Sequence, residues 1–371
     1  MIPVFLCVLL TVRASQSTPR ALDVQTGSRP LAEVPFTLFQ NAVIVPAVVN
    51  GRDTVRLLLD TGWGPLALVA AAAHRLHLPL DNPGPGGLRR AHLQSLSIGQ
   101  VVQSVPLVEV FPTDALTPFI GPHDGVLSTA FFRDLVLQVD YPAGIVRFFR
   151  RSPITSPPST TVPRVSVPMV FAPGAGALPF TDSVFVDGRA VRGLFDTGGA
   201  GAFVAMPRFV ARASLRPIPD SGRVGMGLLH GDTLVRQVVH FTSVRRLAIG
   251  PFTVDSPRVM IAPPQMAGAD WEHDLVIGYG FLRHYIVTFD YPGKLVTLER
   301  PIQQAPGPSS SARRSRRPLK LLRLLHRSMR SICAPSPPSS PCSEHRAIPC
   351  GRATTSRCNR SSSIGQGSGR S

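Results

Sequence analysis

Cysteine is missing from almost the whole chain. The five cysteines are Cys7 and a C-terminal group of four, Cys333, Cys342, Cys350 and Cys358. Because residues 8–332 contain no cysteine, no disulfide can link two points within this region. The body of the protein therefore depends on burial of apolar side chains. The spacing of the four C-terminal cysteines matches no common zinc pattern, so the sequence predicts no metal site. If the protein is exported from the cytoplasm, disulfides can form within that C-terminal group.

Charged residues are scarce as well, and those of one sign are unevenly placed. They make up 16% of the chain against 43% hydrophobic residues, which is typical of a globular protein. The net charge is +17, but residues 303–371 hold 13 of the 39 basic residues and one of the 22 acidic ones. The remaining 302 residues carry only +5. The basic character thus belongs to the tail, and the sequence does not predict nucleic-acid binding.

Long apolar runs are also lacking, since none reaches the ~18–20 residues that span a bilayer. A short run, Ile2 to Val12, precedes Val12-Arg13-Ala14 and a polar stretch. This order predicts a signal peptide over residues 1–14 and export to the periplasm, the cell envelope or the medium. A wrongly assigned start and a buried first strand are the alternatives.

The tail, residues 303–371, is rich in Ser, Pro and Arg, which is typical of a disordered extension. Within it Leu321, Leu325 and Met329 can share one helical face opposite basic residues, a pattern that binds anionic membrane surfaces. Out-of-frame translation of GC-rich sequence would yield a similar composition. A disordered extension or such an artefact is favoured, with weak membrane contact as the alternative.

The body of the chain repeats itself. In each copy an Asn-Gly or Asp-Gly pair is followed by an apolar run that ends in Asp-Thr-Gly. The two copies run Val49-Asn50-Gly51-Arg52 to Asp60-Thr61-Gly62, and Val186-Asp187-Gly188-Arg189 to Asp196-Thr197-Gly198. Asn-Gly and Asp-Gly between apolar runs are strong hairpin signals. Each copy therefore predicts a hairpin whose second strand delivers Asp-Thr-Gly at its end.

Three more landmarks recur in the same order. They are Leu96-Ser97-Ile98-Gly99 with Leu247-Ala248-Ile249-Gly250, Asp124-Gly125-Val126-Leu127 with Asp274-Leu275-Val276-Ile277, and Val139-Asp140-Tyr141-Pro142 with Phe289-Asp290-Tyr291-Pro292. The offset between copies grows from 136 at Asp-Thr-Gly to 151 and 150 at the later landmarks. The second copy thus holds about fifteen extra residues, which we place in a longer loop or hairpin around Gly222 to Gly231.

Short β-branched and aromatic runs bounded by turn residues dominate the rest. Only Leu66 to Leu78 and Pro207 to Ala213 look helical, and proline clusters over residues 151–166. The expected fold is all-β, with two similar barrel-like lobes and short helices. The first lobe is placed at residues 33–150, a Pro-rich linker at 151–166 and the second lobe at 167–302.

These motifs make the chain resemble the pepsin-like and retropepsin-like aspartyl proteases, particularly bacterial tandem forms, over roughly Pro35 to Pro301. In that family two carboxyl groups about 3 Å apart share one proton, because like charges that close cannot both ionise. The resemblance implies an aspartic-type endopeptidase that acts on peptides or proteins without a cofactor. It also implies that Asp60 and Asp196 are the catalytic pair and that one chain forms a pseudo-dimer.

The residues beside the two aspartates have expected supporting roles. The hydroxyls of Thr61 and Thr197 can lock the two loops, while Gly62 and Gly198 leave room for the backbone to turn. A flap that closes over substrate is expected in the second copy. Its candidate substrate contacts are Met226, Leu228 and Leu229, and Trp63 either lines the substrate pocket or caps the core.

The sequence departs from the family at three positions. Ser128 follows Val126-Leu127 where Gly is usual, and Trp63 and Gly199 follow Asp-Thr-Gly where Ser, Thr or Ala is usual. A hydroxyl at those last two positions would lower the pKa of the carboxyl group. A non-catalytic peptide-binding protein is therefore the alternative function, and pairing of each lobe with another chain is the alternative assembly.

Other polar residues are interpreted as structural. Asp124 and Asp274 are expected to bond nearby backbone, and Asp140 and Asp290 precede Tyr-Pro at turns. His74 has no second ligand cluster nearby that would make a metal site.

Overall fold

A computed structural model of the chain describes residues 29–84, 87–105, 107–111, 117, 121–154, 163–172, 176–230, 233–264 and 273–301. All of them belong to one compact unit. The expected signal peptide (1–14) and basic tail (303–371) lie outside the described residues, as do residues 155–162 of the expected linker. No helix among the described residues is both long and apolar enough to cross a membrane.

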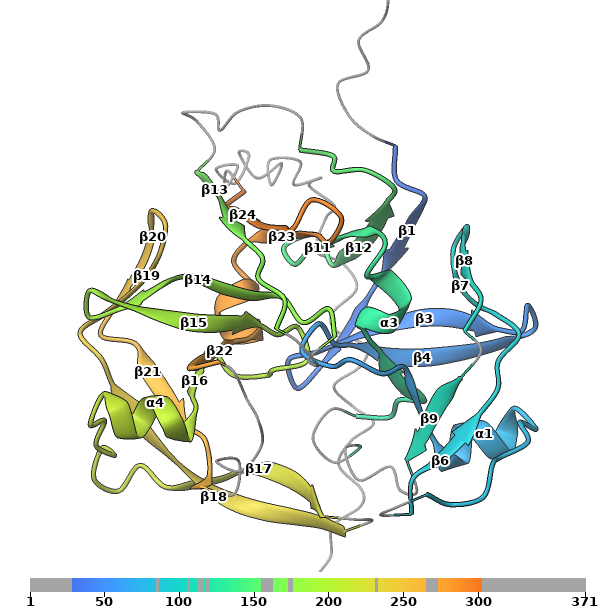
Figure 1. Ribbon diagram of the computed structural model, residues 1–371, viewed down its shortest axis with the longest axis horizontal. Coiled ribbons are helices and arrows are strands. Elements are labelled where there is room, and N and C mark those ends of the chain that lie inside the picture. Colours follow the sequence, from blue (N-terminus) through green and yellow to red (C-terminus); the bar gives the residue numbers. More distant parts are fainter. Residues whose placement is uncertain are drawn as a thin grey trace, which may run out of the picture. The chain divides into compact units, whose positions relative to one another are not determined.

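The fold is all-β with short helices, as the sequence predicts (Figure 1). The first lobe is a nine-stranded sheet in the order β6-β9-β5-β10-β4-β3-β7-β8, with β2 paired to β3. Its strands are β2 (Thr37–Phe39), β3 (Ala42–Val49), β4 (Asp53–Leu59), β5 (Ala67–Val69), β6 (Arg89–Ala91), β7 (Leu96–Ile98), β8 (Val101–Gln103), β9 (Val108–Phe111) and β10 (Gly125–Leu127).

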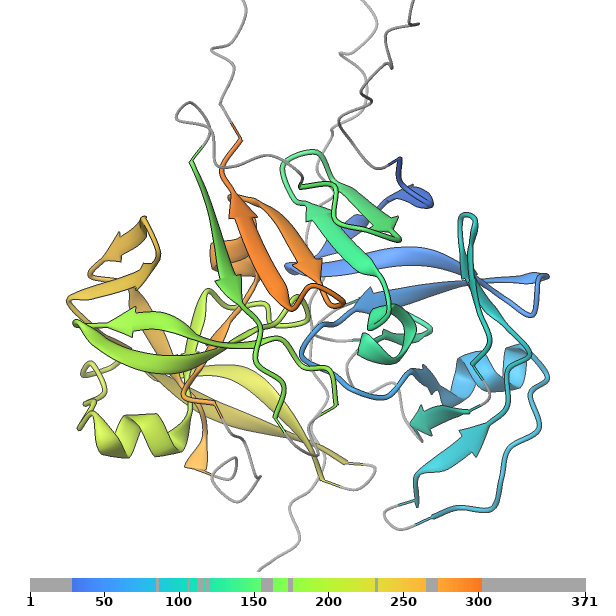
Figure 2. The ribbon, with the colours of Figure 1, turned by 45° about the horizontal axis from the view of Figure 1, so that its top comes forward.

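The second lobe repeats this order with nine strands, β17-β18-β21-β16-β22-β15-β14-β19-β20. Its strands are β14 (Phe180–Val186), β15 (Arg189–Phe195), β16 (Phe203–Ala205), β17 (Arg223–His230), β18 (Thr233–Ser243), β19 (Arg246–Ile249), β20 (Phe252–Asp255), β21 (Arg258–Ile261) and β22 (Leu275–Ile277). Strand β18 occupies the place of the short β6, and β17 has no counterpart among the described residues of the first lobe. The extra residues of the second copy therefore form the hairpin β17–β18 (Figure 2).

A third sheet of six strands takes three strands from each half, which the sequence did not predict. Its order is β1 (Ala32–Pro35), β12 (Ile145–Phe149), β11 (Val136–Asp140), β23 (Ile286–Asp290), β24 (Leu295–Glu299) and β13 (Arg164–Pro168). The central pair, β11 and β23, is antiparallel and aligns Gln138 with Thr288. These two residues are equivalent in the repeat, at an offset of 150, so the register is the one that a two-fold axis between the copies requires.

Local sequence explains the two hairpins that precede the Asp-Thr-Gly segments. Asn50 and Gly51 have φ of 50° and 69°, and Asp187 and Gly188 have φ of 51° and 81°. Both turns need positive φ at two successive residues, which Asn, Asp and Gly tolerate best. Each turn sends the following strand, β4 or β15, back beside its neighbour with its last residues buried.

The helices are α1 (Ala70–Arg75), α3 (Thr129–Phe132), α4 (Pro207–Arg212) and α5 (Tyr279–Leu282). The helix expected over Leu66 to Leu78 was too long, because Ala67–Val69 form strand β5, between β10 and β9. Pairing on both sides outweighs the helical propensity of this Ala-rich and Leu-rich segment. The expected linker also overlaps the third sheet, since β13 begins at Arg164 and pairs with β24.

Candidate active site

Asp60 and Asp196 lie directly after the buried strands β4 and β15. Each of these strands has a parallel neighbour, β10 for β4 and β22 for β15. The Asp60 N–H donates to the Leu127 carbonyl at 3.0 Å, and the Asp196 N–H donates to the Ile277 carbonyl at 2.9 Å. These equivalent bonds give the two aspartates the same backbone position in each lobe.

The threonines join the two loops to each other. The Thr61 N–H donates to Thr197 Oγ1 and the Thr197 N–H donates to Thr61 Oγ1, each at 3.0 Å. Each hydroxyl in turn donates at 2.8 Å across the lobes, from Thr61 to the Phe195 carbonyl and from Thr197 to the Leu59 carbonyl. Both threonines are fully buried, so all four bonds are shielded from water. The sequence predicts this locking role, and the geometry agrees with it.

The glycines let the two carboxyl groups approach each other. A Cβ on Gly62 would lie 2.6 Å from Cγ of Asp196, and a Cβ on Gly198 would lie 2.5 Å from Cγ of Asp60. Each carboxyl group therefore packs against the backbone of the opposite loop. The two carboxyl groups lie near enough for the charge of Asp196 to contribute to a raised pKa of Asp60. The structure thus brings together the two aspartates that the sequence pairs.

Both carboxyl groups are buried, but they accept different numbers of hydrogen bonds from backbone N–H groups. Burial raises the pKa of Asp60 well above its usual range, and the nearby Asp196 raises it further. Burial also raises the pKa of Asp196, but hydrogen bonds from Asp60 and from three backbone N–H groups oppose this. Gly198 and Gly199 donate to Asp196 Oδ1 at 2.8 and 3.0 Å, whereas Asp60 Oδ1 accepts from Gly62 at 2.8 Å. Negative charge is consequently better stabilised on Asp196.

Two buried tyrosines lie close to the aspartates, each near the aspartate of the other copy. The charge of Asp196 contributes to a raised pKa of Tyr141, and that of Asp60 to a raised pKa of Tyr291, although burial is the larger cause for both. Tyr141 packs edge-on against Tyr279, with ring centroids 5.7 Å apart. The repeated Asp-Tyr-Pro segments were interpreted only as turns, so their part in joining the two halves was missed. Their recurrence was the signal for it.

Ser128, a departure from the family pattern, has a structural explanation. Its hydroxyl donates to the Gly64 carbonyl at 2.8 Å and accepts from the Ala130 N–H at 3.3 Å at the start of α3. In the second lobe a Cβ on Gly278 would lie 2.4 Å from the Gly199 carbonyl oxygen, so only glycine fits there. The two lobes therefore hold the Asp-Thr-Gly loop differently, by a side chain in one and by close backbone approach in the other.

Trp63 packs on the first lobe. Its ring lies 6.0 Å from that of Phe111, and both rings rest on a small apolar cluster that includes Ile44 and Leu58. This position agrees with the interpretation of Trp63 as a cap on the core, and its contact with substrate stays a prediction. Met226, Leu228 and Leu229 all lie in β17 of the hairpin β17–β18, where the sequence placed the flap. Their contact with substrate likewise stays a prediction.

The acids interpreted as structural make structural contacts. Asp124 accepts from the Arg56 N–H at 2.8 Å, and Asp274 accepts from the Arg192 N–H at 3.1 Å. Asp140 accepts from the Ala143 N–H at 3.1 Å, and Asp290 accepts from the Gly293 N–H at 2.8 Å. Within the described part of the chain, no three His, Cys, Asp or Glu residues are grouped closely enough to hold a metal ion.

Comparison with known proteins finds a family match over the second lobe. A family model described as aspartyl protease matches residues 183–281, which hold Asp196 and strands β15 and β22. Among solved structures, the chain is similar to the crystal structure of an aspartic proteinase from Irpex lacteus, with a TM-score of 0.42 and 12% identity. That similarity covers 72% of this chain and 97% of the other. A search of curated proteins returned no match. The resemblance to the pepsin-like and retropepsin-like aspartyl proteases is therefore confirmed, by sequence over the second lobe.

Proposed function

We propose that the chain is an aspartic-type endopeptidase in which Asp60 and Asp196 share one proton and activate a water molecule. The single observation that carries this proposal is the packing of each carboxyl group against the glycine of the opposite loop, at the ends of equivalent buried strands. A shared proton lets one carboxylate act as a base while its partner acts as an acid. Two strand-end aspartates with structural roles alone would have no reason to be brought face to face.

The donors around the pair support an assignment of roles. Asp196 receives the larger number of N–H groups and begins ionised, as general base toward water. Among the described residues, Asp60 accepts a backbone N–H from Gly62 alone, and it begins protonated, as general acid. In the first step Asp196 takes a proton from water, the water oxygen bonds to the peptide carbonyl carbon, and Asp60 gives its proton to the carbonyl oxygen. Asp196 then gives its new proton to the amide nitrogen, Asp60 takes a proton back from one hydroxyl of the tetrahedral intermediate, and the C–N bond breaks, which restores both carboxyl groups.

The cross-lobe contacts support a site completed within one chain. Four hydrogen bonds of the threonine pair and the β11–β23 ladder join the two copies directly. This favours the pseudo-dimer over pairing of each lobe with a second chain. A monomer by light scattering that also cleaves peptide would support the proposal, whereas activity confined to a dimer would contradict this part of it.

Peptide cleavage by the wild type, Asp60→Asn and Asp196→Asn tests the proposal. General acid–base catalysis typically contributes about 10²–10⁴-fold, so we expect each variant to lose at least that much activity across acid to neutral pH. Asp134→Asn is a matched control, because its side chain is 86% exposed. A folded wild-type protein that binds peptides without cleaving any would instead favour the alternative, a non-catalytic peptide-binding protein on the same scaffold.

A further inference from the structure

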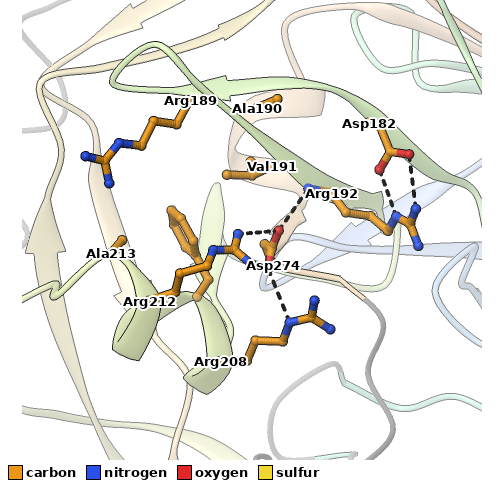
Figure 3. A pocket seen from close by; sticks show the side chains of 10 residues that line it. Asp182, Arg189, Ala190, Val191, Arg192, Arg208, Arg212, Ala213 and Asp274 are labelled. Atoms are coloured by element: carbon orange, nitrogen blue, oxygen red, sulfur yellow. Dashed lines mark hydrogen bonds and ion pairs between the residues drawn. The ribbon is translucent and has the colours of Figure 1, made fainter.

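A basic pocket of about 690 Å³ lies in the second lobe between the start of β15 and helix α4 (Figure 3). Four arginines line it, from two elements: Arg189 and Arg192 come from β15, and Arg208 and Arg212 from α4. Its two acidic residues are Asp182 and Asp274. The pocket is formed by the same strand that carries Asp196, but at the opposite end. The seven-residue strand places it roughly 20 Å from the proposed catalytic pair.

Two of the four arginines are engaged by the acids of the pocket. Arg192 donates to both carboxylate oxygens of Asp182, at 2.8 and 3.1 Å, and Arg212 donates to Asp274 at 2.8 Å. Arg208 only reaches Asp274 at 3.9 Å, with its side chain 65% exposed. No carboxylate of the described residues forms an ion pair with Arg189. The pocket thus holds two more guanidinium groups than carboxylates, and the only ion pair of Arg208 with a described carboxylate is a long one.

Comparison of the two lobes shows which residues of this pocket belong to the repeated fold and which occur in the second lobe alone. The first lobe has a pocket of similar size, about 640 Å³, whose lining includes Asp53, Arg75 and Leu76, the counterparts of Arg189, Arg212 and Ala213. Beside it Arg75 donates to Asp124 at 2.7 Å, as Arg212 does to Asp274, so this ion pair belongs to the shared fold.

The arginines at positions 189 and 208 occur in the second lobe alone. Asp53 begins β4 where Arg189 begins β15, and Ala71 lies four residues before the end of α1, as Arg208 does in α4. The fold forms equally well with those residues in the first lobe. Arg189 and Arg208 are therefore not needed for the architecture.

We propose that this pocket of the second lobe binds an acidic segment of a protein substrate, away from the catalytic pair. Arginine favours this, since its planar fork matches the carboxylate group. Figure 3 draws Arg189 and Arg208 on opposite sides of the Asp274–Arg212 pair. Two separated cations fit two carboxylates along a chain better than one compact anion such as phosphate. The identity of the segment as substrate rests on the proposed function, while the binding itself does not.

The inference is tested by substitutions that copy the first lobe. We compare the full chain with Arg189→Asp plus Arg208→Ala, which gives the second pocket the residues of the first. Arg133→Ala, an exposed position in the first lobe, is the control. An Asp196→Asn background prevents cleavage in the binding experiment. The probe is a glutamate-rich peptide of about ten residues with a photo-crosslinking group, at 150 mM salt, with its Gln counterpart as the neutral comparison.

The expected result is crosslinking of the glutamate-rich peptide to β15 or α4, with binding at least about fivefold weaker in the double variant. The Gln peptide should not crosslink there, and inorganic phosphate at millimolar concentration should not compete. Crosslinks to the basic tail alone, equal binding by the double variant, or competition by phosphate would each overturn the inference.

Kinetics then separate this inference from the proposed function. With the residues of the catalytic pair intact, the double variant should raise KM for substrates carrying an acidic segment about six to eight residues from the cleaved bond. It should leave neutral substrates unchanged. Binding without any cleavage by the wild type would contradict the endopeptidase but keep the acidic-segment site. Cleavage by the wild type with identical kinetics on acidic and neutral substrates would support the endopeptidase but contradict the acidic-segment site.

Discussion

Thr61 and Thr197 each accept the other's backbone N–H with a side-chain hydroxyl, both at 3.0 Å. The two residues are 136 positions apart and equivalent in the repeat. This reciprocal pair holds the two aspartate loops at one separation. It explains why threonine, and not merely any β-branched residue, precedes glycine in both segments.

We expect Thr61→Val to destabilise the protein and to lower its activity. Valine keeps the shape but leaves the buried Phe195 carbonyl and Thr197 N–H without their partner, which typically costs about 2–4 kcal/mol of unfolding free energy in total. Denaturant titration measures the loss. Thr61→Ser retains the hydroxyl and is the control, and equal stability of the Val and Ser variants would contradict the locking role.

We expect Gly62→Ala to abolish peptide cleavage with a smaller effect on folding. The new methyl group would lie 2.6 Å from Cγ of Asp196, so it pushes that carboxyl group away from Asp60. Gly64→Ala, two residues on, meets no atom within 4 Å and should retain activity. The kcat values and far-UV circular dichroism of both variants are the measurement. An active Gly62→Ala enzyme would show that the close approach of the carboxyl groups is unnecessary.

We expect Gly199→Ser to move the acid limb of the pH–activity profile to lower pH. Neither Trp63 nor Gly199 offers a hydroxyl to the aspartates, and burial raises the pKa of both carboxyl groups. A Cβ at position 199 lies 3.1 Å from Asp196 Oδ2, so a serine hydroxyl would reach the carboxylate and lower its pKa. Gly199→Ala adds the same Cβ without a donor. If both variants shift the limb equally, the hydroxyl is not the cause.

Asp60→Asn should stabilise the folded protein at neutral pH. The raised pKa means that the folded state holds the Asp60 proton more tightly than the unfolded chain does. Asp60 thus contributes stability at low pH that is lost as the pH rises through the folded pKa. An amide cannot lose a proton, so the Tm of the variant should exceed that of the wild type near pH 7. The gap should close below about pH 4, where aspartate is protonated in both states. A difference in Tm that does not change with pH would contradict a raised pKa of Asp60 in the folded protein.

The tyrosines of the two Asp-Tyr-Pro segments give a further prediction. The hydroxyls of Tyr141 and Tyr291 are buried and have no hydrogen-bond partner among the described residues. Removing one by Tyr291→Phe should leave the unfolding free energy unchanged or raise it by about 1 kcal/mol. Tyr291→Ala should lower it by about 3–5 kcal/mol, because a buried ring is lost. A strong loss with phenylalanine would reveal a hydrogen bond that the hydroxyl makes.

The hairpins of the two copies could be predicted because they depend on residues that are close together in the sequence. The Asn50-Gly51 and Asp187-Gly188 turns require φ values that few residues adopt, so the hairpins follow from the sequence. The offset change from 136 to about 150 located the extra hairpin β17–β18. Helix Leu66 to Leu78 was overestimated because local propensity competes there with strand pairing on both sides.

The amino-acid sequence was enough to predict the duplication, the strands that end in Asp60 and Asp196, and the longer hairpin of the second copy. The folded structure was needed to show how the copies join, through the six-stranded sheet and the threonine pair, and which aspartate has more donors. It also decided that Arg189 and Arg208 meet at one pocket. The physical reason is range: turn chemistry and strand periodicity act over a few residues. Contacts between residues 136 or 150 positions apart exist only after both halves fold.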